Sequence, residues 1–575
     1  MFFMIMNDNR FGEMRYISTV LLVVMTLCLN AQTSFIPPLE RKVTVNAENE
    51  TVESILNNIT SQTGILFSYN PGVINSQKTV ICQAENKPVR LVLASILDNS
   101  VTCKTRGKYI ILKNNENDKL QLEGYLYDSQ TGERISFATV YEKTLMASAI
   151  TDQYGHFSID LPPVATPTSL QISKTGYTDT SIISIYRNDK IRPLEVAMSA
   201  NSKDSGKKPS FLSGLIPYWL IPDNIRINSI NISETWPKTL QISLVPGLST
   251  NKLLGGNIEN KFSVNILGGY TKSVGYIELG GVFNVVENNA GFCQIGGISN
   301  FVGGDSKGLQ MAGIYNASFS VDGVQIGGLI NSAREKADIQ LAGIMNKTAD
   351  SKLQISGIAN LAEKTGRIQV SGIVNVADSA DIQIGGIINR ARYARTLQIS
   401  LVNIADTSAG FVIGLLNIVK HGYHKIEFST DEALHANIAF RSGTKKIHGI
   451  ITTGMATFGP AKQAFGVGYG VGTTLGKSVK TTFDIDLSST TIFYRDDFSC
   501  ENMLHKFYAG IDRKLTDKFS LAGGLTLNLL ITDTQSKYYN NVYSDISPYS
   551  FVNKKVGEDH NYKCWIGAKL ALRIL

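Results

Sequence analysis

The sequence predicts a mainly β protein built of several modules and ending in a transmembrane β-barrel. Three observations support this fold class: a composition rich in glycine and poor in proline, segments of alternating apolar and polar residues, and a short motif repeated through the C-terminal half. Of the 575 residues, 51 are Gly, 15 are Pro, 23 are Tyr and 24 are Phe. Such a composition favours strands joined by tight turns.

Charge and hydropathy exclude several function classes. Hydrophobic residues make up 43% of the chain and charged residues 18%, and the formal net charge of +7 is spread over the whole length. These values fit neither a disordered polyelectrolyte nor a bundle of membrane helices. We expect no nucleic-acid partner, because such proteins concentrate their basic residues in a patch or stripe.

Residues 1–31 have the pattern of a secretory signal peptide. Arg15 precedes an apolar run from Ile17 to Leu29, and Ala31 offers a small residue at the cut. A basic start, a short apolar segment and a small residue are typical of such signals. Beyond it, no stretch approaches the roughly 18 consecutive apolar residues of a membrane-spanning helix. We therefore expect an exported protein that is either soluble or a β-barrel.

Residues 41–115 are predicted to form a small α+β module of two strand-helix-strand units. Thr51 can cap a helix whose apolar residues recur at spacings of three and four. This helix face consists of Val52, Ile55, Leu56 and Ile59. The pattern recurs with a strand at Thr79 to Cys82 and a helix from Val89 to Ile96. So small a unit offers no cleft with convergent titratable groups, so we expect an adaptor.

Three segments of this module carry a family resemblance. The helix entries AENETVESIL and AENKPVRLVL and the strand entry QTGILFSY resemble the secretin and TonB N-terminal (STN) domain. The resemblance implies a periplasmic module that contacts a periplasmic or inner-membrane signalling protein. It supplies no catalytic residues.

The cysteine pattern does not indicate a disulfide scaffold. Six cysteines, with Cys28 inside the predicted signal peptide, stand at irregular spacing and form no CxxC pair. A zinc site therefore has no support. Cys82 and Cys103 fall in the STN-like module, where they either pair after export or remain two buried thiols.

Residues 120–198 are predicted to form a β-sandwich. Turn signals recur at Thr131-Gly132 and from Asp152 to Gly155 between alternating segments. The segments DSQTGERISFATV, TDQYGHF and SKTGY resemble the carboxypeptidase regulatory-like domain, which implies a non-catalytic appendage. The order of the two modules resembles outer-membrane receptors of the Bacteroidetes. Residues 199–235 follow as a polar linker without a plug-like segment, so gated TonB-dependent import is not expected.

Residues 236–575 carry an internal repeat. The motif is apolar-Gln-apolar-small-Gly-apolar-x-Asn, with a period of 14 to 16 residues. In a strand the Gln and the Asn share one face, and they form a candidate lumen-facing polar ladder. Its members are Gln294, Asn300, Gln310, Asn316, Gln325, Asn331, Gln340, Asn346, Gln354, Asn360, Gln369, Asn375, Gln383 and Asn389. In the preceding repeat, Glu278 takes the place of Gln.

Two architectures fit this repeat. A barrel of about 18 to 22 strands would turn the apolar face to lipid and the polar face to a watery lumen. A β-solenoid would instead stack each repeat as one rung, with Gln and Asn in ladders. The C-terminal segments TFDIDLS and WIGAKLALRIL favour the barrel, because Asp484, Asp486, Lys569 and Arg573 alternate there with apolar residues.

No catalytic, cofactor or metal site is predicted. His424 and Glu427 have the spacing of a metal pair, but residues three apart on a strand point to opposite faces. The glycine-rich stretch from Gly466 to Gly476 lacks the following helix of a phosphate loop.

The resulting hypothesis is a non-enzymatic outer-membrane β-barrel that is surrounded by lipid and has its N-terminal modules in the periplasm. Its expected role is in envelope transport or signalling. The alternative is a surface or periplasmic β-solenoid that acts in binding or adhesion.

Overall fold

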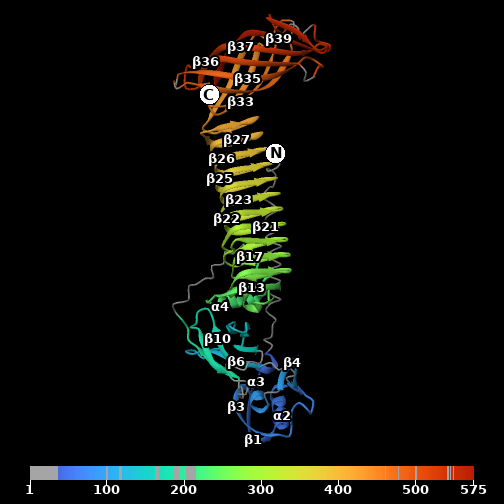
Figure 1. Cartoon of the computed structure of the whole chain (residues 1–575), viewed down its shortest axis with the longest axis vertical. Coiled ribbons are helices and arrows are strands. Elements are labelled where there is room, and N and C mark those ends of the chain that lie inside the picture. The colour runs from blue at the N-terminus through green and yellow to red at the C-terminus, as the bar shows by residue number, and fades with distance from the viewer. Residues whose placement is uncertain are drawn as a thin grey trace. The chain divides into compact units, whose positions relative to one another are not determined.

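The computed structural model describes residues 36–98, 101–114, 120–161, 168–185, 193–201, 215–459, 461–476, 478, 480–498, 502–540, 543, 546–547 and 549–574. The protein is mainly β, as predicted (Figure 1). It has two compact units, residues 1–207 with 230–232 and residues 208–229 with 233–575. The predicted signal peptide, residues 1–31, lies outside the described residues. Within them, no helix combines the length and the apolar character needed to cross a membrane.

The first module of the first unit is α+β, and each of its two helices is entered directly from a strand. Its elements are η1 (Pro38–Glu40), β1 (Lys42–Thr51), α2 (Val52–Thr63), β2 (Leu66–Ser68), β3 (Thr79–Pro88), α3 (Val89–Ile96), β4 (Val101–Arg106) and β5 (Tyr109–Asn114). The Thr51 hydroxyl accepts a hydrogen bond from the Ser54 amide at 3.2 Å, and Gly64 ends α2 at a φ of 69°. The predicted helix face is buried in one core with α3.

The second module is β-sandwich-like, as predicted. Its strands are β6 (Leu120–Asp128), β7 (Thr139–Glu142), β8 (Ala147–Ile150), β9 (His156–Leu161), β10 (Thr168–Ser173), β11 (Thr180–Ile185) and β12 (Leu194–Met198). One sheet has the order β11-β10-β7-β8 and the other β12-β6-β9. Leu126, Val140 and Phe157 belong to their shared buried core.

In the second unit, the repeats form a parallel β-solenoid. The elements η2 (Tyr218–Leu220), α4 (Asp223–Asn231) and η3 (Lys252–Asn257) accompany its first rungs. Its strands are β13 (Trp236–Val245), β14 (Leu248–Ser249), β15 (Ile258–Asn265), β16 (Gly268–Thr271), β17 (Ser273–Gly280), β18 (Phe283–Val286), β19 (Cys293–Gly296), β20 (Ser299–Val302), β21 (Asp305–Ala312), β22 (Tyr315–Gly327), β23 (Ile330–Ala342), β24 (Met345–Ser356), β25 (Ala359–Ser371), β26 (Val374–Gly385), β27 (Ile388–Ile399), β28 (Val402–Ser408), β29 (Phe411–Ile413) and β30 (Leu416–Val419). Equivalent residues of successive repeats pair in parallel, for example Gln325 with Gln340 and Asn331 with Asn346.

The barrel occupies the rest of the second unit. Its strands are β31 (Tyr423–Asp431), β32 (Ala436–Gly443), β33 (His448–Met455), β34 (Phe465–Leu475), β35 (Thr481–Phe493), β36 (Met503–Lys514), β37 (Phe519–Asp533) and β39 (His560–Ile574). They are antiparallel, and β31 pairs with β39 to close the sheet. The extra strand β38 (Val552–Val556) adds to β39.

This division corrects the prediction of one barrel over residues 236–575. The repeats follow the solenoid alternative, and the closed barrel has eight strands instead of about 18 to 22. A barrel strand and a solenoid rung alternate in the same way, so the sequence pattern did not separate them. The difference lies in the motif's Gly. A Cβ on Gly328 would lie 1.9 Å from the Gly313 carbonyl oxygen, which marks a tight corner stacked on the previous corner.

Candidate functional site

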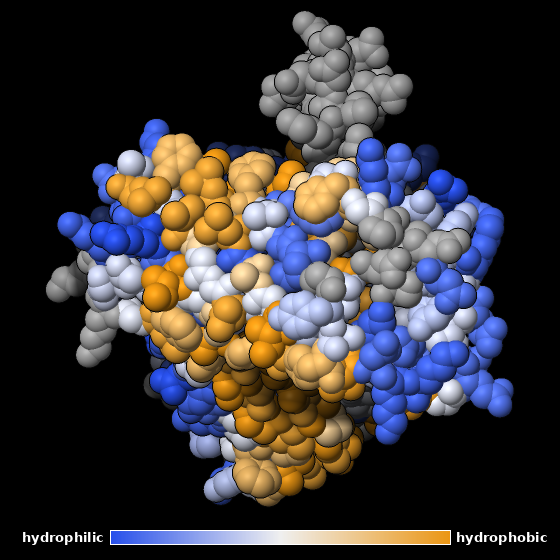
Figure 2. Space-filling view, turned by 90° about the horizontal axis from the view of Figure 1, so that it is seen from above, coloured by the Kyte–Doolittle hydropathy of each residue, from blue (hydrophilic) through white to orange (hydrophobic). Residues whose placement is uncertain are grey.

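The outside of the barrel is a belt of exposed apolar side chains. Phe428, Phe440 and Leu527 have 44%, 40% and 49% of their surface exposed, and they alternate with buried residues along their strands. Figure 2, seen from above the view of Figure 1, shows hydrophobic side chains gathered in connected areas beside hydrophilic ones. Such a belt fits the hydrocarbon core of a membrane.

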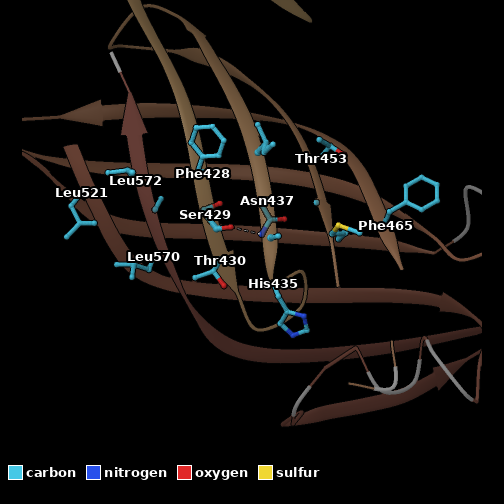
Figure 3. A pocket seen from close by; sticks show the side chains of 15 residues that line it. Phe428, Ser429, Thr430, His435, Asn437, Thr453, Phe465, Leu521, Leu570 and Leu572 are labelled. Carbon is cyan, nitrogen blue, oxygen red and sulfur yellow. Dashed lines mark hydrogen bonds between the residues drawn. The ribbon is translucent and has the colours of Figure 1, made fainter. Parts of the chain in front are cut away.

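Part of this outer face is hollowed into a groove of about 720 Å³ (Figure 3). Residues of β31, β32, β33 and β39 contribute most of its lining, and the exposed side chains of Phe428, Ile438 and Leu570 are among them. Ser429 and Asn437 add polar groups. A mostly apolar groove on this face suits a lipid acyl chain better than a polar solute.

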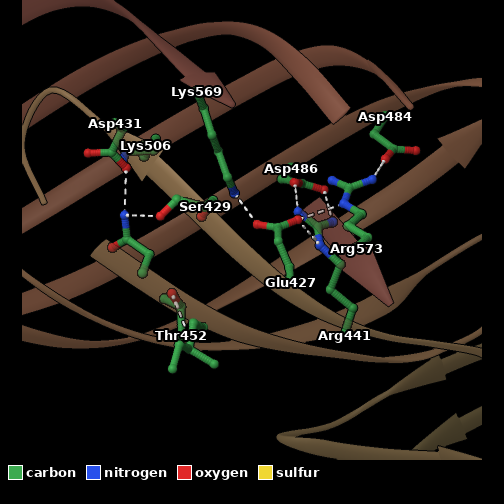
Figure 4. Close-up of polar contacts among 12 residues, drawn as sticks. Glu427, Ser429, Asp431, Arg441, Thr452, Asp484, Asp486, Lys506, Lys569 and Arg573 are labelled. Atoms are coloured by element: carbon green, nitrogen blue, oxygen red, sulfur yellow. Dashed lines mark hydrogen bonds and ion pairs between the residues drawn. The ribbon is translucent and has the colours of Figure 1, made fainter. Parts of the chain in front are cut away.

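The inside of the barrel is filled by ion pairs centred on Glu427 (Figure 4). Its carboxylate pairs with Arg441 Nε at 2.8 Å, with Arg573 Nε at 2.7 Å and with Lys569 Nζ at 2.5 Å. The side chains of Glu427 and of both arginines are fully buried. Three strands, β31, β32 and β39, are therefore joined at one carboxylate.

The two arginines extend this network across the barrel. Arg441 donates to both oxygens of Asp486, and Arg573 pairs with Asp484 and, at 2.8 Å, with Asp512. With the outer pairs included, five acidic groups face five basic groups. They are Glu427, Asp431, Asp484, Asp486 and Asp512, and Lys425, Arg441, Lys506, Lys569 and Arg573. Loss of one partner would leave a buried charge unpaired, at a cost of about 3–5 kcal/mol, so the network favours one strand arrangement.

A cavity of about 40 Å³ lies among Arg441, Asp486 and Lys569. At the end away from the solenoid, an apolar cluster that includes Tyr543 and Trp565 fills the interior. A filled interior is usual for barrels of eight strands.

Sequence reasoning found part of this network. Asp484, Asp486 and Arg573 alternate with outward apolar residues as predicted, but they are ion-paired and do not line an open lumen. Glu427 was considered only as a metal partner of His424, and the structure makes it the centre of the network. No cluster of potential metal ligands occurs among the described residues. The sequence does contain a signal for Glu427: by alternation it shares one face of β31, the inward one, with other polar residues.

The predicted polar ladder lies inside the solenoid and not in a barrel lumen. Each Gln donates through Nε2 to Oε1 of the Gln one rung earlier, at 2.7–2.9 Å, from Gln310 through Gln398. Each Asn donates in the opposite direction, at 2.9–3.1 Å, from Asn284 through Asn403. All of these amides are buried. Within each ladder, neighbouring amides therefore satisfy one another, as is usual for buried polar groups.

Glu278 ends the Gln ladder on its N-terminal side. Its carboxylate accepts hydrogen bonds from Gln294 Nε2 at 2.8 Å and from Asn265 Nδ2 at 3.0 Å. An acceptor suits this position, because every Gln of the ladder donates toward it. Burial raises the pKa of Glu278 to about 7.

Cys82 and Cys103 are free thiols in one apolar core. Cys82 is buried, with its Sγ 3.5 Å from the Ser95 hydroxyl, and Cys103 is half-buried. Burial raises the pKa of Cys103 to about 12, so its reactive thiolate form is scarce at neutral pH. In the structure the two cysteines therefore remain thiols and do not form the disulfide that the sequence left open.

A buried polar cluster joins the two N-terminal modules. Arg90 of α3 pairs with Glu40 at 3.1 Å and with Glu123 of β6 at 3.3 Å. The Tyr125 hydroxyl donates to Glu40 at 2.8 Å, and burial together with this carboxylate raises the pKa of Tyr125. These contacts bind the two modules into one unit.

The closed barrel and the sandwich-like module fit an outer-membrane-type β protein. A family model described as CarboxypepD_reg-like domain matches residues 122–206, which include most of the β-sandwich-like module. Comparison of the chain with curated proteins gives no match. The likeness of residues 41–115 to the STN domain rests on the sequence pattern.

Proposed function

We propose that this protein is an outer-membrane anchor that holds a periplasmic β-solenoid and two N-terminal adaptor modules and acts in envelope signalling. The observation that carries the proposal is a closed eight-strand barrel with an apolar outside and an ion-paired inside. An apolar belt left in water would cost about 25 cal/mol per Å². Solute transport has less support, because the interior is filled by charged pairs and an apolar cluster.

Loop lengths favour one direction across the membrane. The turns at the solenoid end of the barrel are residues 444–447, 476–480 and 515–518. The connections at the other end are residues 432–435, 456–464, 494–502 and 534–559. Outer-membrane barrels keep short turns in the periplasm and longer loops outside. In this proposal the solenoid end is periplasmic, and the STN-like module meets a periplasmic or inner-membrane signalling protein.

The test combines membrane fractionation, gel mobility before and after boiling, and conductance in a planar bilayer. We expect the protein in the outer-membrane fraction, a mobility shift on boiling, and no conductance above that of lipid alone. Leu527→Arg should reduce the heat-shifted fraction, because a cation at the middle of a lipid-facing strand costs about 2–4 kcal/mol.

Leu515→Arg is the matched control. It makes the same substitution in the short turn after β36, where the side chain is 58% exposed and the cost falls to about 0–1 kcal/mol. Recovery of the wild type in the soluble fraction without a mobility shift would contradict the anchor. A steady conductance would contradict the filled interior.

A further inference from the structure

The solenoid presents two unlike outer walls. One wall carries charged side chains that pair between neighbouring rungs, for example Lys352 with Asp338 at 2.8 Å and Arg392 with Asp378 at 2.8 Å. These pairs are exposed, which is usual for a face in contact with water.

The other wall is an apolar ridge, formed by two ladders of side chains. At the position after the inward Gln, which is replaced by Ser263, Glu278 or Val412 in three rungs, twelve rungs from Ile242 to Ile413 carry Ile, Leu, Val or Met. At the corner that the motif's Gly forms, a ladder from Ile298 to Leu415 consists of Ile and Leu residues that are 38–54% exposed. No charged residue interrupts either ladder. Soluble surfaces rarely leave so large a continuous apolar area uncovered.

The dimensions of the ridge match a protein interface. Twelve rungs about 4.8 Å apart extend over about 50 Å, and the three residues from one ladder to the next cover about 10 Å. The product is about 500 Å² on each copy, so two copies bury about 1,000 Å² together, which is the area that a biological interface should reach. A small ligand would cover a fraction of it.

The repeat period identifies the kind of partner. Side chains that recur at the rung spacing leave grooves at the same spacing, and a second copy of the chain supplies ridges that fit these grooves at every rung. We propose that the apolar ridge is the interface between two copies of this chain, packed solenoid to solenoid. The interface itself does not depend on the anchor proposed above. The direction of the two solenoids does depend on the anchor, because two barrels inserted alike in one membrane hold their solenoids parallel.

Disulfide cross-linking in outer-membrane preparations tests this proposal. Ile358 lies on the corner ladder, and Lys352 is the matched position on the charged wall. Both are changed to Cys in a Cys293→Ser background, because Cys293 precedes a ladder Gln on the same strand. After mild oxidation we expect most of the Ile358→Cys protein, and little of the Lys352→Cys protein, to run as a dimer on a non-reducing gel.

A second variant tests the oligomeric state through the molar mass of the solubilised protein. Ile358→Asp combined with Ile373→Asp should convert a dimer into a monomer by light scattering of the detergent-solubilised protein, while the barrel's heat shift is unchanged. Equal cross-linking at positions 352 and 358 would overturn the proposal. So would a monomeric wild type. A monomeric wild type that carries lipid phosphate, where the double variant carries none, would show that the ridge is a lipid site. A monomeric wild type without lipid phosphate would show that another part of the same chain covers the ridge.

Discussion

At the scale of single residues, Glu278 makes the stability of the solenoid depend on pH. Its pKa is about 7 in the folded protein, above the value of about 4.3 for an exposed Glu, so the folded state binds this proton more tightly than the unfolded state. The contribution of Glu278 to the stability of the folded state is therefore full below about pH 4. It falls as the pH rises toward 7 and is constant above that. Glu278→Gln should remove this fall. Thermal unfolding followed by circular dichroism at pH 4.5 to 8.5 measures the difference.

Glu363→Gln is the control for this prediction. Glu363 is also a solenoid carboxylate, but its side chain is 65% exposed, so its replacement should leave the pH profile of the wild type unchanged. Parallel pH profiles for the wild type and the Glu278→Gln variant would contradict the prediction.

At the scale of elements, the corner glycines decide that the repeat folds as a solenoid rung. A Cβ on Gly343 would lie 2.2 Å from the Gly328 carbonyl oxygen, so Gly343→Ala must push two rungs apart. An overpacked interior loses about 1–3 kcal/mol, and we expect the midpoint of thermal unfolding to fall accordingly. Gly275→Ala is the matched control in an earlier rung, because its nearest atom, the Asn260 carbonyl oxygen, is 3.8 Å away. Equal midpoints for the two variants would show that the corners have room to relax.

Elements with local signals were predictable from the sequence. Thr51 and Gly64 mark both ends of α2, and alternation placed Asp484 and Arg573 inside the barrel. The partner of each strand was not predictable, because an Ile-Gln-Ile pattern alternates in the same way whether its neighbour is parallel or antiparallel. The Glu427 network was missed for a related reason: its ion pairs join residues up to 146 positions apart, and alternation along one strand does not show which charges meet.

At the scale of the whole molecule, the direction of the barrel decides between the proposed function and its alternative. With the solenoid in the periplasm, the protein is an anchored adaptor. With the solenoid outside the cell, the same architecture would fit a surface binding or adhesion protein. The loop lengths favour the first arrangement, since the longest connection, residues 534–559, lies at the end away from the solenoid.

Cysteine labelling of intact cells measures this direction. Lys537 lies in that longest connection with its side chain 73% exposed, and Asp517 lies in a turn at the solenoid end with its side chain fully exposed. A maleimide that does not cross the outer membrane should label Lys537→Cys in intact cells and should label Asp517→Cys only after the membrane is permeabilised. The wild type gives the background from the native thiols. The reverse pattern would place the solenoid, and the apolar ridge with it, at the cell surface, and the alternative function would then replace the adaptor.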